Sequence, residues 1–166
     1  MNKILLIESE HKKHSQILKE FFQNLSPILN IKGFYVDKVK GNEQLQINLL
    51  SQRSKSFLLN LNRNQDEIHS ALETFLELLI NELSVFELVD IFLLDKLGML
   101  EMHSPRLKQQ IITVFSSRIP VIATVHQQDL QKLDYLLDYT TIKTLDLTEF
   151  DEQDMFSNLI RELYDL

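Results

Sequence analysis

Short, almost purely apolar runs alternate along this sequence with segments whose apolar residues recur every three or four positions. Three such runs are KILLI at Lys3–Ile7, LVDIFLL at Leu88–Leu94 and PVIATV at Pro120–Val125. Such runs are typical of strands that a parallel sheet buries on both faces, and Thr141–Leu147 is expected to be a fourth. The alternation predicts an α/β fold with three layers, in which helices cover both faces of a mostly parallel sheet.

The intervening segments have the period of amphipathic helices. Asp66–Leu83 shows it most clearly, and in Ile17–Leu25 the pattern stops just before a proline. Ser104 before a proline is a good helix start, because serine caps free N–H groups and proline suits the first helical position. A helix is also expected over Asp129–Leu137. Thr148 with Asp151 resembles a capping box for a closing helix.

One stretch departs from this alternation. Between Gly33 and Leu61 apolar and polar residues alternate singly, and Gly41-Asn42 reads as a turn. This pattern predicts an antiparallel hairpin or small meander near residues 33–61, at the edge of the sheet. The sequence shows no linker or internal repeat, so we expect one domain over residues 1–166.

Composition narrows the possible partners. The net charge of −7 argues against nucleic-acid binding, which needs clustered lysines and arginines. The absence of cysteine excludes disulfides and thiolate zinc sites, and it fits a reducing cytosol. No apolar run approaches the ~20 residues of a membrane span. We expect a cytoplasmic protein without nucleic-acid or membrane partners, and a protein partner stays open.

The first loop after a strand stands where a phosphate-binding P-loop would stand. A P-loop reads G-x-x-x-x-G-K-[ST], and in Glu8–Ser15 only Ser15 matches it. Glu8 and Lys13 occupy the glycine positions and His14 the lysine position. No glycine occurs before residue 33, and other residues seldom adopt the positive φ angles that such a loop requires. We expect no phosphate cradle here.

The residues after the second apolar run carry a stronger signal. Residues 95–102 read DKLGMLEM, which resembles the motif D-E-I-G-x-M-E-L of the THEP-type nucleoside triphosphatases, a small family of P-loop NTPases. Gly33-Phe34, with Val39-Lys40 after it, resembles the family's G-F-x-T-x-E-V-R segment, and Pro120–His126 resembles the strand after the motif. The resemblance covers nearly the whole chain. It implies a P-loop NTPase fold and hydrolysis of nucleoside triphosphates with Mg²⁺.

Residue by residue, the resemblance assigns Mg²⁺ to Asp95 and Ser15, and it puts Lys96 where the family has its water-activating glutamate. The departures from the family's motifs, in the P-loop and at Lys96, favour a degenerate family member with little or no hydrolysis of nucleoside triphosphates. Such a member would act as a binding or interaction protein. The alternative is a weak Mg²⁺-dependent triphosphatase or nucleotide-binding protein. In that case Lys12, Lys13 or Lys96 contacts phosphate, beside His14 and Ser15.

Each candidate residue also has a plain structural interpretation. The loop Glu8–Ser15 reads as an ordinary connection from strand to helix, and Asp95 as a cap on a turn. Lys96 reads as a solvated side chain, and Glu101 as a surface carboxylate. A sharper hypothesis places the Lys96 ammonium beside Asp95, where it replaces the charge of Mg²⁺.

Overall fold

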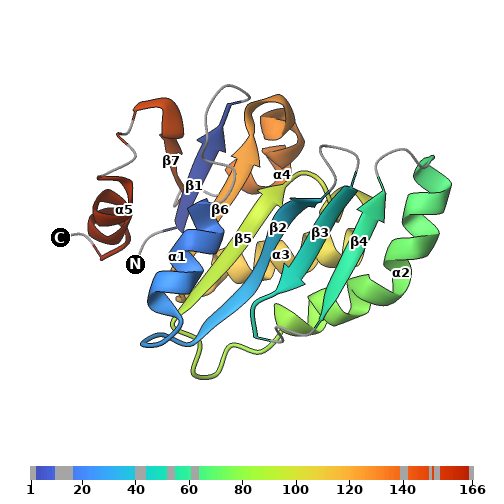
Figure 1. Ribbon diagram of the computed structural model, residues 1–166, viewed down its shortest axis with the longest axis horizontal. Helices are drawn as coiled ribbons and strands as arrows, with labels where there is room; N and C mark the ends of the chain where they lie inside the picture. The colour runs from blue at the N-terminus through green and yellow to red at the C-terminus, as the bar shows by residue number, and fades with distance from the viewer. Residues whose placement is uncertain are drawn as a thin grey trace.

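The computed structural model describes residues 3–9, 17–39, 44–51, 55–60, 64–138, 142–149, 151 and 154–164. They form a seven-stranded sheet of order β4-β3-β2-β5-β6-β1-β7 (Figure 1). The strands are β1 (Lys3–Glu8), β2 (Ile31–Val39), β3 (Gln44–Leu49), β4 (Ser56–Asn60), β5 (Ile91–Leu97), β6 (Val121–His126) and β7 (Ile142–Asp146). The α-helices are α1 (Ile17–Leu25), α2 (Gln65–Glu82), α3 (Pro105–Ser116), α4 (Asp134–Leu137) and α5 (Met155–Tyr164). Short 3₁₀ helices are η1 (Glu101–His103), η2 (Gln127–Leu133) and η3 (Leu147–Glu149).

The parallel part of the sheet confirms the expected α/β class. β2, β5, β6, β1 and β7 run parallel, and β6 lies between β1 and β5. The boundaries differ from those expected: β5 begins at Ile91 rather than Leu88 and runs on to Leu97. The helix expected over Asp129–Leu137 is instead the 3₁₀ helix η2 followed by one turn of α-helix, α4. No helix in the described segments is long and apolar enough to cross a membrane.

The antiparallel extension lies where the alternating pattern placed it. β3 pairs with β2 and with β4, so these strands extend one edge of the sheet, while the turn predicted at Gly41-Asn42 falls outside the described residues. Gly33 is required where β2 meets β5. Its φ is +128°, and a Cβ there would lie 1.9 Å from the carbonyl oxygen of Leu93. The Gly33-Phe34 segment therefore has a packing role.

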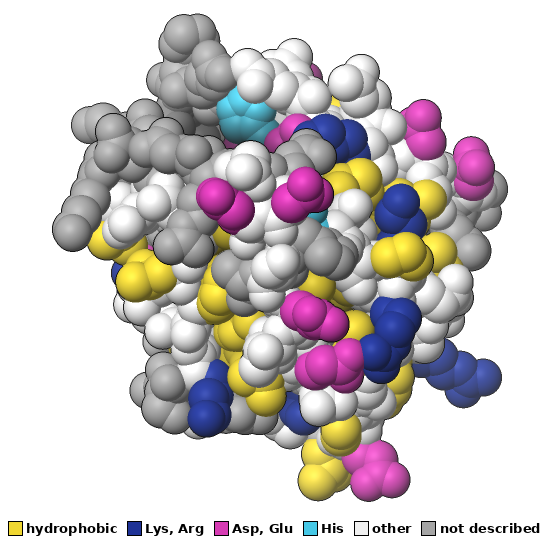
Figure 2. All heavy atoms as spheres, turned by 90° about the vertical axis from the view of Figure 1, so that its right-hand side faces the viewer, with side chains coloured by type: hydrophobic (Ala, Val, Ile, Leu, Met, Phe, Trp, Pro, Cys, Tyr) yellow, Lys and Arg dark blue, Asp and Glu magenta, His cyan; other side chains and the backbone are white. Residues whose placement is uncertain are grey.

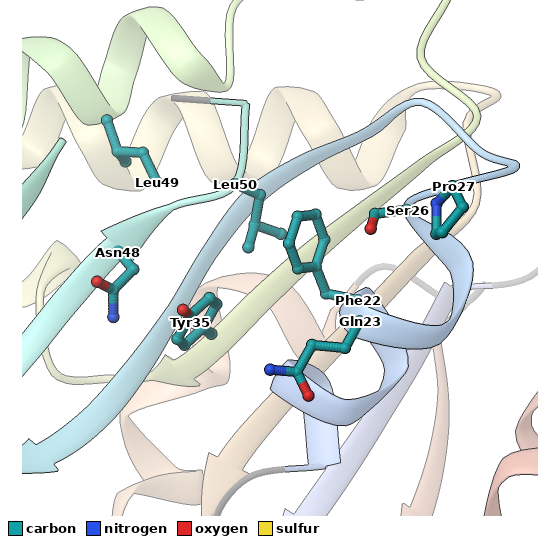
Figure 3. Close-up of a pocket in the computed structure, with 8 residues that line it drawn as sticks. All are labelled: Phe22, Gln23, Ser26, Pro27, Tyr35, Asn48, Leu49 and Leu50. Carbon is teal, nitrogen blue, oxygen red and sulfur yellow. The ribbon is translucent and has the colours of Figure 1, made fainter. Parts of the chain in front are cut away.

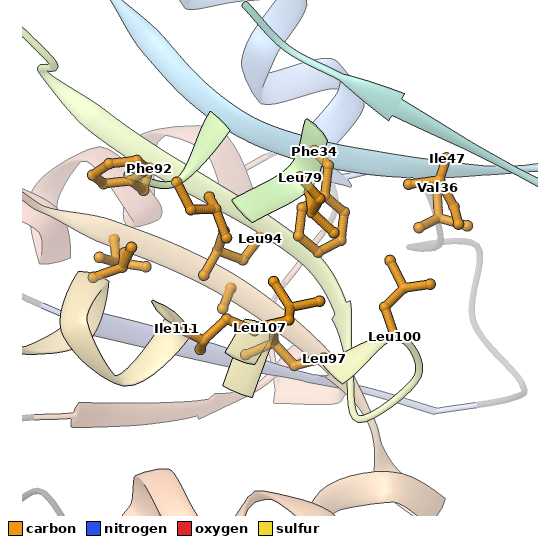
Figure 4. Packing of buried hydrophobic residues seen from close by; sticks show 14 of the residues in the cluster. Phe34, Val36, Ile47, Leu79, Phe92, Leu94, Leu97, Leu100, Leu107 and Ile111 are labelled. Carbon is orange, nitrogen blue, oxygen red and sulfur yellow. The ribbon is translucent and has the colours of Figure 1, made fainter. Parts of the chain in front are cut away.

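Two apolar cores cover the two faces of the sheet. Helices α2 and α3 pack on one face, where Leu79, Phe92 and Leu107 are fully buried (Figure 4). Helices α1 and α5 pack on the other, around residues such as Phe21 and Leu159. The three layers follow from apolar residues that alternate between these cores along each central strand.

Helices α2 and α3 begin with side-chain caps. The Ser104 hydroxyl accepts a hydrogen bond from the Leu107 N–H at 3.1 Å, as expected, and Asn64 caps α2 in the same way. The capping box expected at Thr148 is wrong. Helix α5 begins at Met155, and the Thr148 N–H donates to Asp146 Oδ1 at 2.9 Å in the turn after β7.

Candidate functional site

The carboxyl ends of β1, β5 and β6 meet at one edge of the sheet, where ligands of parallel α/β sheets bind. Glu8 is the last residue of β1 and lies in register with His126, the last residue of β6. Asp95 and Lys96 lie near the end of β5, on the other side of β6. The fold therefore gathers residues that are up to 118 positions apart in sequence, from Glu8 to His126, at one place.

A β-bulge in β5 sets the direction of the Lys96 side chain. The register between β5 and β6 shifts between Leu94 and Leu97, and Lys96 has a left-handed φ of +56°. Its N–H leaves the regular ladder and donates to Thr124 Oγ1 at 2.8 Å. A non-glycine residue in this conformation is strained, and such residues cluster at functional sites in proteins.

Lys96 forms a buried ion pair with Glu8. Its Nζ lies 2.5 Å from Glu8 Oε2, and the two side chains are only 17% and 6% exposed. The interpretation of Lys96 as a solvated side chain is therefore wrong. Because β6 separates β1 from β5, the pair reaches across an intervening strand. Lys96 adjoins Asp95 in the chain, but its ammonium donates to Glu8.

The environment of Glu8 opposes its ionisation. Burial raises the pKa of Glu8, and the positive charges of Lys96 and, more weakly, Lys38 counteract that rise. Oxygen Oε1 of Glu8 is buried and has no hydrogen-bond partner in the part of the chain that the structure describes. The Lys96 ammonium is thus the main group that keeps this carboxylate charged inside the protein.

Asp95 ties three strands together. Its Oδ1 accepts from Thr124 Oγ1 of β6 at 2.6 Å, and its Oδ2 accepts from the Val36 N–H of β2 at 2.9 Å. The side chain is 2% exposed. Burial raises the pKa of Asp95 to about 6, the charge of Lys96 lowers it, and that of Glu8 raises it. Asp95 is therefore more than a turn cap, because its carboxylate continues the pairing of β2 with β5.

Glu101 is a buried carboxylate, so the interpretation as a surface group is wrong. It is 1% exposed and accepts hydrogen bonds from the Gly98 N–H and, at 3.0 Å, from the Tyr135 hydroxyl. Burial raises the pKa of Glu101, and burial together with the Glu101 charge raises the pKa of Tyr135. Gly98 has a φ of +92°, with Asp129 packed closely against it. These two residues of the motif shape the loop after β5.

The described residues do not fit Mg²⁺. Both oxygens of Asp95 accept hydrogen bonds from protein donors, and the positive charge of Lys96, which acts on Asp95, opposes the binding of a further cation. No cluster of three or more metal-ligating side chains occurs among the residues with described positions. Lys12, Lys13, His14 and Ser15 lie outside the described residues, so their assigned roles stay predictions.

The sequence alone did not reveal the partners of these residues. Glu8 and Lys96 each stood out as a departure, but their pairing was missed, as were Thr124, Val36 and Tyr135. One signal in the sequence could have predicted the pair. Glu8 and Lys96 carry opposite charges, and each comes just after an apolar run expected to be a strand whose carboxyl end lies at the same edge of the sheet.

Comparison with known proteins agrees with this fold. A family model described as NTPase matches residues 13–160 of the chain. Among solved structures, the solution structure of a human cancer-related nucleoside triphosphatase superposes with a TM-score of 0.70 at 13% sequence identity. The match covers 96% of each chain, so the two share a fold along nearly their whole length. No curated protein matches the sequence.

Proposed function

Because the chain belongs to the THEP-type family of nucleoside triphosphatases, we propose that it is a degenerate member with little or no hydrolysis, which acts by binding. The observation that carries the proposal is the buried ion pair between Glu8 and Lys96. By the motif comparison, both residues occupy positions that serve phosphate binding or catalysis in the family. Glu8 replaces the first glycine of the phosphate loop, and Lys96 replaces the glutamate that activates water.

Electrostatics supports this proposal for the phosphate side of the site. A carboxylate about 5 Å from a phosphate oxygen repels each unit of charge by about 3 kcal/mol at an effective dielectric constant near 20. Lys96 offsets much of this repulsion, but its ammonium is held by Glu8 at 2.5 Å, so the pair offers a phosphate no net attraction. A triphosphate would have to break the pair to gain a positive contact.

The groups that would bind Mg²⁺ and orient the attacking water are altered as well. Phosphoryl transfer depends on positioning and charge supplied jointly by the loop, a lysine, Mg²⁺ and a group that orients water. Both oxygens of Asp95 accept hydrogen bonds, from Thr124 and Val36. Lys96 donates a hydrogen bond where a glutamate would accept one. Groups that act as a unit are strongly non-additive, so one repaired residue leaves the others limiting.

We propose that this binding protein acts in the cytoplasm, and its surface charge argues against a nucleic-acid partner. Figure 2 looks at the side of β4 and α2, where acidic and basic side chains are interspersed over the described part of the surface. The net charge of the whole chain is −7. Phosphate backbones instead select proteins with clustered positive charge. The proposed partner is another protein or a small molecule.

The test is phosphate release by the purified protein from Mg-ATP and Mg-GTP. We expect background rates for the unmodified protein, for Lys96→Glu and for His14→Lys. A thermal-shift series with Mg-ATP, Mg-GTP, ADP and sulfate reports binding independently, since a ligand at 100 times its Kd stabilises by ~2.7 kcal/mol. Magnesium-dependent turnover that Asp95→Asn and Ser15→Ala both abolish would establish the alternative, a weak triphosphatase.

A further inference from the structure

A hollow of about 370 Å³ lies between α1 and the strands β2 and β3 (Figure 3). It shares no residue with the Glu8–Lys96 pair. Its origin is visible in Figure 1: α1 covers the middle of the sheet, and none of the described helices covers β3 and β4 on that face. The volume is within the range of about 300–1,000 Å³ typical of small-molecule sites.

Two aromatic rings form one wall of this pocket. Phe22 of α1 and Tyr35 of β2 have ring centroids 6.5 Å apart and planes tilted by 36°. Pro27 closes the end beyond α1, and Leu50, which is 4% exposed, adds an apolar surface from the segment after β3. Flat walls of this kind favour a planar aromatic guest, which packs by offset or edge contacts.

Polar groups with unused bonding capacity surround these rings. In the described part of the chain, the Tyr35 hydroxyl and the exposed Gln23 amide make no hydrogen bond. Asn48 is 8% exposed, and its only side-chain bond there is from Nδ2 to the Gln46 carbonyl oxygen at 3.3 Å. Its Oδ1 is therefore free to accept. A ligand with a hydrogen-bond donor and an acceptor along its edge would bond to these groups. A ligand without such atoms would leave them unpaired in the complex and would bind more weakly.

The charges nearby cancel. Lys19 lies 5.6 Å from the centroid of the Tyr35 ring and forms an ion pair with Asp37 at 3.2 Å. None of the described residues that line the pocket is Asp, Glu, Lys, Arg or His. An ionised guest would lose its hydration here without gaining an opposite charge, so the pocket selects an uncharged one.

We propose that this pocket binds an uncharged, planar heteroaromatic compound of one or two rings, with a hydrogen-bond donor and acceptor on its edge. The ring packs against Phe22 and Tyr35, and its edge bonds to Asn48, Gln23 and the Tyr35 hydroxyl. The proposal goes beyond the proposed function and does not depend on it. Loss of hydrolysis is argued from Glu8 and Lys96, and binding here from other residues.

The test is NMR titration of the ¹⁵N-labelled full chain with adenine at millimolar concentrations. We expect saturable shift changes at the amides of Phe22, Tyr35, Asn48 and Leu50. Indole, which offers a donor but no acceptor, should bind more weakly. Adenosine tells whether the natural ligand is a free base or a nucleoside, and AMP, whose phosphate is charged, should bind more weakly than adenosine. The absence of saturable changes at these amides with both adenine and adenosine, or tighter binding of AMP than of adenosine, would overturn the proposal.

Variants locate the site. Tyr35→Phe removes only a hydroxyl, and we expect adenine binding to weaken about threefold to tenfold. Asn48→Ala removes the inner acceptor and should weaken it about tenfold. Tyr164→Phe, on α5, is the matched control and should leave affinity unchanged. Melting curves confirm that each variant is folded. Equal affinity in all three variants would refute binding at this pocket.

Discussion

Replacing Lys96 by methionine isolates the energy of the buried pair. At the observed 2.5 Å, the attraction between Lys96 and Glu8 is about 7 kcal/mol at an effective dielectric constant near 20. This attraction offsets a desolvation cost of several kcal/mol for each ion. Lys96→Met abolishes the attraction but leaves the Glu8 carboxylate buried, so we expect the free energy of unfolding to fall by about 3 kcal/mol near pH 7.

Urea unfolding followed by circular dichroism measures this loss. The double variant Glu8→Gln/Lys96→Met should recover part of it, because no buried charge remains. The loss in Lys96→Met should also shrink at acidic pH, where Glu8 takes up a proton. Lys143→Met is the matched control. It breaks an exposed pair with Glu162 and should cost at most about 1 kcal/mol. If Lys96→Met costs no more than this control, the reasoning about the buried pair is refuted.

Three further predictions concern other positions. Gly33→Ala should destabilise by more than about 3 kcal/mol, or prevent folding, because its Cβ would lie 1.9 Å from the Leu93 carbonyl oxygen; thermal unfolding measures this. Leu88→Gly should stabilise by up to about 1 kcal/mol in the same assay, since Leu88 has a φ of +61° and is 87% exposed. The pKa of Asp95 is raised by burial to about 6, so its proton stabilises the fold at low pH. That contribution, about 3 kcal/mol, is lost as pH rises from about 4 to about 6, and the difference in stability between wild type and Asp95→Asn across this range tests it.

The architecture could be predicted because its signals are local. The buried runs at Lys3–Ile7 and Pro120–Val125 need no partner to be read as strands, and the Ser104-Pro105 start contains its own cap. The boundary of β5 was harder. Val89 is apolar, but it lies in the connection before the strand, where Asn30 and Asp90 exchange hydrogen bonds.

The site could be located from the sequence, but its contacts could not. Asp95 and Lys96 were identified as site residues from a motif. The contacts that decide their roles involve Thr124, Val36 and Glu8, and the pair with Glu8 spans 88 positions. The positive φ of Lys96 arises from a bulge that depends on the register with β6, which no local pattern reports.

The contacts of Asp95 have a consequence for the exchange of backbone protons with solvent. The backbone ladder between β2 and β5 ends at the Phe34–Leu94 pair, and that between β5 and β6 is interrupted after Leu94. Side chains supply the bonds at this point: the Val36 N–H donates to Asp95, and the Lys96 N–H donates to Thr124 before the β5–β6 pairing resumes at Leu97. These two amides are therefore shielded by a carboxylate and a hydroxyl that are themselves bonded to each other. Both protons should exchange only when the middle of the sheet opens as one unit, and deuterium uptake at Val36 and Lys96 should follow a single time course.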